Sequence, residues 1–168
     1  MDLSKLAPSD AVVALRSLER RYRALFADLG EDESPDDVAR RPGGEGGWSV
    51  LEHIVAAAWA IAACGRSIEA VLTTDVPNLT ATDVDPDARP RPGSPSGTLH
   101  ERLAELGLEA NQVADRIEHV PANDWKRTGV VGDGASREVT VLDLVRAAVD
   151  AGVGHLRAAE RLVAQVRS

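Results

Sequence analysis

Two histidines, His53 and His155, are the side chains of this sequence best suited to chemistry. An imidazole can accept or donate a proton near neutral pH. The sequence has no HExxH, CxxC, GxSxG or glycine-rich phosphate-loop motif that would indicate a more specific mechanism. The two histidines are therefore candidates for acid–base catalysis. The alternative is a structural role, since a histidine on an apolar helix face is commonly a hydrogen-bonded core residue.

His53 lies at the start of a predicted helix over residues 49–72. Ser49 and Glu52 have the spacing of a capping box, which satisfies free backbone groups of the first turn. Trp48 and His53 occupy the staple positions on either side of the cap, where their side chains can pack together. Residues 54–65 carry no charge. A helix without a polar face is expected to be covered on all sides.

His155 lies in a second predicted helix, over residues 140–166, on a side that also carries alanines. Small side chains on this helix and on the helix of His53 could leave room for a ligand. We expect a pocket lined by Ala56, Trp59, Ala60, Ala151 and Gly154. Close helix packing, or burial in a homodimer interface, would explain the same small residues.

Helical periodicity recurs in two further stretches, residues 9–29 and 98–120. No segment alternates with a period of two over a length sufficient for a core strand. Long connections over residues 30–47, 74–97 and 121–139 are rich in Pro, Gly, Asp and Ser. We therefore predict an all-α, four-helix bundle with long crossover loops. The chain of residues 1–168 is expected to form one domain, with residues 1–8 as a flexible tail.

Composition limits the classes of partner. The 168 residues carry a net charge of −8, and the basic residues are scattered among acids. This argues against a nucleic acid or an anionic membrane surface as partner. The uncharged run is shorter than the roughly 20 residues of a membrane span. A single cysteine, Cys64, expected to be a buried unreactive thiol, and the lack of a signal-peptide pattern at the N-terminus predict a cytoplasmic protein.

The order and spacing of several short motifs resemble the DinB-like superfamily, which includes metal-dependent thiol transferases and mycothiol-dependent maleylpyruvate isomerases. The motifs are Trp48-Ser49-Val50-Leu51-Glu52, Asp75-Val76-Pro77, Asn123-Asp124-Trp125-Lys126-Arg127-Thr128-Gly129, Asp133-Gly134, Thr140-Val141 and His155-Leu156. The resemblance covers nearly the whole chain. It implies a four-helix bundle with long crossovers, usually dimeric, and it does not imply DNA binding.

The resemblance also implies where a metal would bind. Members of the superfamily hold a divalent metal with a histidine eight residues after the helix tryptophan and a His-x3-His or Glu-x3-His pair in the last helix. These positions are Ala56, Asp150 and Gly154 here, and His155 corresponds to a histidine that often follows the last ligand. Alanine and glycine have no donor atom in the side chain. The sequence therefore predicts a DinB-like protein without the usual metal and without another cofactor.

Three hypotheses about function follow from this comparison. The first is a metal-independent transferase, isomerase or lyase acting on a small organic molecule, with His53, His155 and Asp150 as its acid–base groups. The second is a non-catalytic ligand-binding or dimeric interaction protein. The third is a thiol S-transferase of the mycothiol type, with a rearranged metal site that uses the same three side chains. The two histidines near the former metal site favour the first.

Overall fold

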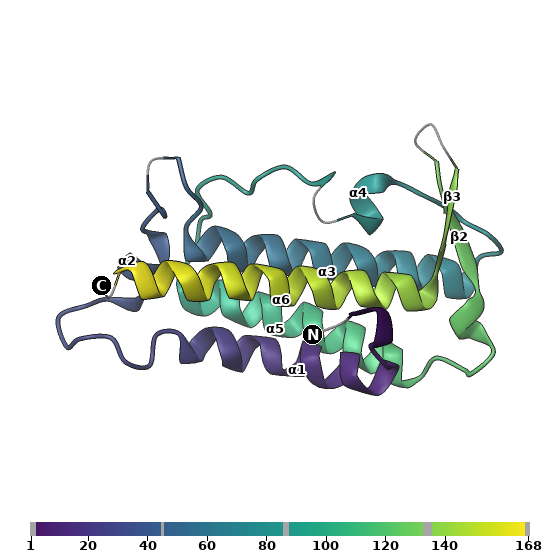
Figure 1. Cartoon of the computed structure of the whole chain (residues 1–168), viewed down its shortest axis with the longest axis horizontal. Helices are drawn as coiled ribbons and strands as arrows, with labels where there is room; N and C mark the ends of the chain where they lie inside the picture. The colour runs from purple at the N-terminus through teal and green to yellow at the C-terminus, as the bar shows by residue number, and fades with distance from the viewer. Residues whose placement is uncertain (1–2, 45, 86–87, 133–135, 167–168) are drawn as a thin grey trace.

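The computed structural model describes residues 3–44, 46–85, 88–132 and 136–166 and shows a bundle of four long helices (Figure 1). They are α1 (Pro8–Ala24), α3 (Val50–Thr73), α5 (Leu99–Glu118) and α6 (Val141–Val166). Both α1 and α3 pack against α5 and α6. The predicted all-α four-helix bundle is therefore confirmed.

Capping boxes begin three of the four long helices, including the predicted box at Ser49. The Ser49 hydroxyl accepts from the Glu52 backbone N–H at 3.2 Å, and the Glu52 carboxylate accepts from the Ser49 N–H at 2.8 Å. Thr98 starts α5 with the same reciprocal pair of bonds. Thr140 caps α6 together with Asp143. Each box satisfies backbone N–H groups that lack a partner within the helix, which fixes where the helix starts.

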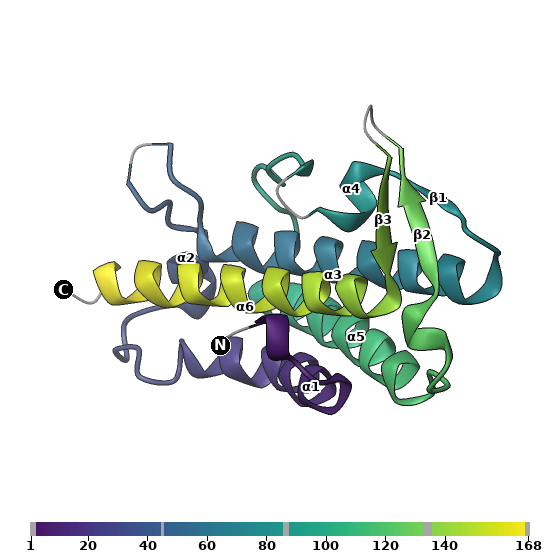
Figure 2. The same ribbon diagram turned by 45° about the vertical axis from the view of Figure 1, so that its right-hand side comes forward.

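One of the three long connections runs beside the bundle, and each of the other two joins two helices at one end of it (Figure 1). Helices α3 and α5 point in the same direction, so the chain between them returns along the length of the bundle (Figures 1 and 2). The first two connections include the short helices α2 (Pro35–Arg40) and α4 (Ala81–Val84). The connection between α3 and α5 is therefore a long crossover, as predicted, whereas the other two long connections are not.

A small three-stranded sheet, which the periodicity did not predict, joins two of the connections. Its strands are β1 (Asn78–Leu79), β2 (Thr128–Val131), which follows the 3-10 turn η3 (Asp124–Lys126), and β3 (Arg137–Thr140). β1 pairs in parallel with β2, and β2 pairs antiparallel with β3. Strands of two to four residues are too short to show an alternating pattern in the sequence. The Asp133-Gly134 motif lies outside the described residues.

Helix α3 is mostly buried, but it is not covered on all sides as expected. Ile54 and Ile61 are fully buried, whereas Trp59 is 44% exposed. By length and composition α3 could cross a membrane, although 67% of its most apolar stretch is buried inside the bundle, as is usual for the core helix of a soluble protein. On the other side of the core, a Cβ at Gly152 would lie 2.6 Å from a Leu18 methyl group, so α6 approaches α1 closely there.

The N-terminal segment differs from the expected flexible tail. Residues 1–2 lie outside the described part of the chain, but Leu3–Lys5 forms a 3-10 turn, η1, and Leu6 is buried. The Nη2 atom of Arg146 donates to the Ser4 carbonyl at 2.7 Å. Helix α1 also ends at Ala24, five residues before the predicted end. The chain continues in tighter turns, in which each N–H bonds three residues back, so Leu25 and Phe26 still pack against the core.

Candidate functional site

Trp48, His53 and His155 form one cluster where the start of α3 meets α6. The Trp48 ring stacks on His53 with centroids 5.0 Å apart and on His155 at 5.8 Å. The two imidazoles approach each other with Nδ1 atoms 3.0 Å apart, a hydrogen-bond distance. The capped first turn fixes His53 beside Trp48, and the packing of α3 against α6 adds His155, which lies 102 residues further along the chain.

The Nδ1–Nδ1 contact determines how protons are distributed over the pair. One Nδ1 must carry the hydrogen and the other must offer its lone pair. When both rings are neutral, the donor ring then has an unprotonated Nε2, and the acceptor ring has a protonated Nε2. The pair therefore holds one basic nitrogen and one N–H donor at the same time, the combination that general acid–base catalysis requires.

Burial keeps His53 neutral. Burial is the largest cause, and together with the nearby charge of His155 it lowers the pKa of His53 from an ordinary 6.5 to about 4, while Glu52 opposes the shift. At neutral pH the His53 imidazole is therefore a base rather than a cation.

Arg91, from the connection between α3 and α5, fastens that connection to the start of α3. Its Nε donates to one Glu52 oxygen at 2.6 Å and its Nη2 donates to the other at 2.8 Å. Its Nη1 and Nη2 also donate to the carbonyls of Gly46 and Gly47. The guanidinium carbon lies 5.7 Å from the centroid of the Trp48 ring. The hydrogen bond from Arg91 lowers the pKa of the buried Glu52 carboxyl, although burial acts in the opposite direction.

A cavity of about 260 Å³ opens beside the histidine pair. Its lining comes from α3, α6 and the connection that Arg91 holds: Trp48, His53, Ala56, Trp59, Arg89, Pro90 and His155. Ala56 is only half-buried. Its methyl group stands at the position where the resemblance to the DinB-like superfamily implies a histidine, and it is smaller than an imidazole.

The structure brings together only some of the residues predicted for the site. His53, His155, Ala56 and Trp59 line one cavity. Four others do not: Ala60 and Ala151 are buried, whereas Asp150 and Gly154 are exposed. Open space surrounds the position that a Cβ of Gly154 would take. The close approach through glycine on α6 occurs at Gly152 instead.

Arg89, Pro90 and Arg91 were missed by sequence reasoning, because a loop has no periodicity that shows which side chains turn inward. The available signal was an Arg-Pro-Arg-Pro run at residues 89–92 within an acidic, loop-rich segment. Cys64, in contrast, is fully buried as predicted, and burial raises the pKa of its thiol to about 11. It is therefore not poised as a nucleophile.

The donor set does not fit the metal of the DinB-like superfamily. Two imidazole nitrogens are close together, but Ala56 and Gly154 supply no donor atom, and Asp150 is exposed to solvent. Within the described ranges, no group of three or more His, Cys, Asp or Glu side chains is placed to hold a metal ion. Three protein ligands are the usual minimum for a catalytic zinc site.

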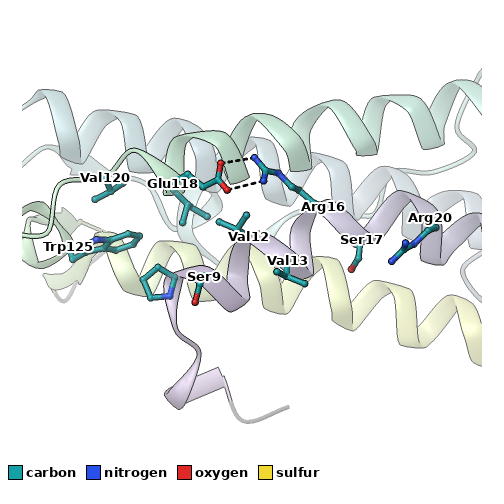
Figure 3. A pocket seen from close by; sticks show the side chains of 11 residues that line it. Ser9, Val12, Val13, Arg16, Ser17, Arg20, Glu118, Val120 and Trp125 are labelled. Carbon is teal, nitrogen blue, oxygen red and sulfur yellow. Dashed lines mark hydrogen bonds and ion pairs between the residues drawn. The ribbon is translucent and has the colours of Figure 1, made fainter.

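A larger groove of about 820 Å³ lies between the start of α1 and the end of α5 (Figure 3). Val12, Val13 and Trp125 give it an apolar surface, and Val13 is 69% exposed. Its Arg16 already bonds Glu118 with two nitrogens and Asp115 with one. No histidine or cysteine is among its described lining residues, so it is less equipped for chemistry than the histidine cavity.

The chain is similar to a solved structure with the same architecture. That structure is YfiT from Bacillus subtilis, described as a probable metal-dependent hydrolase with an unusual four-helix bundle topology. The TM-score is 0.74 at 14% sequence identity, over 95% of this chain and 87% of YfiT. The fold is that of YfiT. The four-helix bundle that the resemblance to the DinB-like superfamily implies is thereby confirmed as a fold, and a fold by itself does not transfer an activity.

No family model matches the chain, and no curated protein matches its sequence.

Proposed function

We propose that this protein is a metal-independent enzyme that transfers a proton on a small organic molecule bound beside His53 and His155. The supporting observation is the 3.0 Å contact between the two Nδ1 atoms in residues that line a cavity. A neutral pair can take a proton from substrate carbon at its unprotonated Nε2. It can return a proton from the protonated Nε2 of the other ring, while the shared Nδ1 hydrogen moves across the contact. Nothing is consumed, and the net reaction is an isomerisation.

The histidine contact also supports this proposal over a rearranged thiol transferase. Such a transferase needs a third metal ligand, and Asp150, which was expected to contribute, is exposed. The exposure of Asp150 likewise leaves the histidine pair as the acid–base groups. A cytoplasmic location and a homodimeric state, without a nucleic acid or membrane partner, remain predictions of the sequence.

Proton exchange with solvent tests the proposal while the substrate itself is unidentified. Small carbonyl compounds are incubated with the protein in D2O at neutral pH, and proton NMR follows the signal of the hydrogen next to the carbonyl. We expect wild-type protein to exchange this hydrogen in at least one compound. His53→Gln and His155→Gln should each slow exchange by about 100-fold or more, the usual contribution of a general base.

His100→Gln is the matched control, because His100 is exposed in the first turn of α5 and does not line the cavity. It should exchange at the wild-type rate. Exchange that persists in the His53→Gln, His155→Gln double variant would contradict the proposal. Exchange in none of the compounds would favour the non-catalytic binding protein instead.

A further inference from the structure

We propose that Arg89 makes the histidine cavity a site for a small organic monocarboxylate. The Arg89 side chain lines the cavity together with His53 and His155. Its Nε donates to the Thr82 carbonyl at 2.5 Å. Its Nη1 and Nη2 are buried and have no hydrogen-bond partner among the described residues. This inference rests on the proposed function only in that both use the same cavity.

It is costly for two buried nitrogens of a guanidinium to lack hydrogen-bond partners. Arginine keeps its charge under all physiological conditions, so it cannot escape the cost by losing a proton. Leaving a charged donor buried and unpaired is more unfavourable than leaving a neutral one. Burial accordingly lowers the pKa of Arg89, against the opposing effect of Cys64 and Asp83. An anion that accepted hydrogen bonds from Nη1 and Nη2 would remove this cost.

The neighbouring acid does not fill this role. Asp83 acts on Arg89 electrostatically, but its Oδ2 accepts from the Thr80 backbone N–H at 3.2 Å and from the Thr80 hydroxyl at 2.5 Å. It serves as the cap of α4. The second nearby acid, Asp85, makes no hydrogen bond with either Nη atom of Arg89.

Arg91, two residues further on, shows the contrast within one segment. All three of its nitrogens donate, to Glu52 and to the carbonyls of Gly46 and Gly47. Arg91 therefore has a complete set of partners inside the protein and holds the connection in place. Arg89 lines the cavity but has no such partners at Nη1 and Nη2 among the described residues. The pattern separates an arginine that positions the segment from one that is suited to a ligand.

The lining of the cavity limits what kind of anion fits. A carboxylate matches the two parallel donors of a guanidinium. Trp48, Trp59 and Pro90 offer flat apolar surface to the rest of the molecule, and 260 Å³ admits only a small one. Arg89 is the single arginine or lysine among the described lining residues, so one negative charge can be balanced. Nη1 and Nη2 are buried, so the Arg89 side chain must turn toward the cavity to bind the carboxylate. This turn breaks no hydrogen bond between Nη1 or Nη2 and a described residue.

Calorimetric titration with benzoate and with benzamide tests the inference. The two probes have nearly the same shape and differ in charge, and neither needs to react. We expect wild-type protein to bind benzoate more tightly than benzamide. Arg89→Gln should weaken benzoate binding at least about tenfold and leave benzamide unchanged, because a charge-assisted pair is lost. Arg66→Gln is the control, since Arg66 carries the same charge near Arg89 but is exposed and does not line the cavity.

A measurement on the wild-type protein keeps the test valid if Arg89→Gln fails to fold. The NMR signal of the Arg89 Nε–H, assigned by its loss in Arg89→Lys, should shift on addition of benzoate and not of benzamide. Equal binding of the two probes, no binding of benzoate, or a preference for benzoate that survives Arg89→Gln would overturn the inference. If the exchange of carbonyl hydrogens depends on the histidines but the protein does not prefer benzoate, only the inference of a carboxylate ligand is overturned. Benzoate binding through Arg89 without any exchange would overturn only the proposed catalysis.

Discussion

The histidine cavity and the groove at Trp125 lie toward opposite ends of the bundle and differ in how their charges are used. In the groove, Arg16 is exposed and fully paired with Glu118 and Asp115. At the cavity, the charges are divided between a pair of the buried Glu52 with the partly exposed Arg91 and an arginine, Arg89, with two nitrogens unpaired among the described residues. The groove is about three times larger. The proposed site is therefore chosen for its uncompensated polar groups and not for its size.

Removal of the Glu52 carboxylate is expected to have the largest effect. Glu52→Ala deletes the acceptor of two Arg91 bonds and half of the α3 capping box, in a buried position. We expect the free energy of unfolding to fall by about 2–3 kcal/mol, below the full cost of breaking a buried pair because Arg91 is partly exposed. Urea denaturation followed by circular dichroism measures this loss.

Glu101→Ala provides the matched control for Glu52. Glu101 completes the same kind of capping box at the start of α5, where it bonds groups of Thr98 and receives no bidentate arginine. Glu101→Ala should lower the free energy of unfolding clearly less than Glu52→Ala does. If both variants lower the free energy of unfolding equally, the hydrogen bonds between Arg91 and Glu52 contribute nothing to stability beyond the capping box.

Acid should lower the stability of the folded protein through protonation of His53. Between pH 6.5 and about 4, His53 is protonated in the unfolded chain and still neutral in the folded protein. Stability therefore decreases as the pH falls through this range and levels off below it. Because the ring is partly exposed, solvent screening leaves roughly 1–2 kcal/mol of the effect. His53→Gln should flatten the stability profile in this range. An unchanged slope in the variant would contradict the lowered pKa.

The groove should show the smallest response. Glu118→Gln removes the charge of one Arg16 partner, but both side chains are exposed and Asp115 remains. Surface ion pairs contribute little to stability in water. We expect no measurable change in denaturation midpoint, and no change in benzoate binding or carbonyl exchange. A loss of exchange in Glu118→Gln would move the functional site from the histidine cavity to the groove.

The starts of the helices were predictable because they depend on neighbouring residues. The boxes at Ser49, Thr98 and Thr140 satisfy backbone groups only three residues away, so their spacing is visible in the sequence. The end of α1 was not predictable in the same way. Leu25 and Phe26 continue the apolar pattern while the backbone already turns more tightly, so periodicity alone extended the helix too far.

Part of the candidate site was also predictable from residue type and helix face. This reasoning predicts His53, His155, Ala56 and Trp59, which line one cavity, but it also predicts Ala60, Ala151 and Gly154, which do not line it. Asp150 was chosen from its counted position against the family pattern, which gives no orientation, and it is exposed. Arg89 and Arg91 lie in a connection without periodicity, so no local rule indicated which of them would turn inward.

By itself, the sequence determined the fold class, the helix starts, the stacking of Trp48 on His53, and the absence of metal-donor side chains at positions 56 and 154. These features depend on side-chain chemistry and on contacts within one helical turn. Only the tertiary structure decided that His53 meets His155, that every side-chain nitrogen of Arg91 donates a hydrogen bond, and that Nη1 and Nη2 of Arg89 have no partner among the described residues. These contacts join separate elements, and their geometry follows from how α3, α6 and the long connection pack together, which local spacing does not encode.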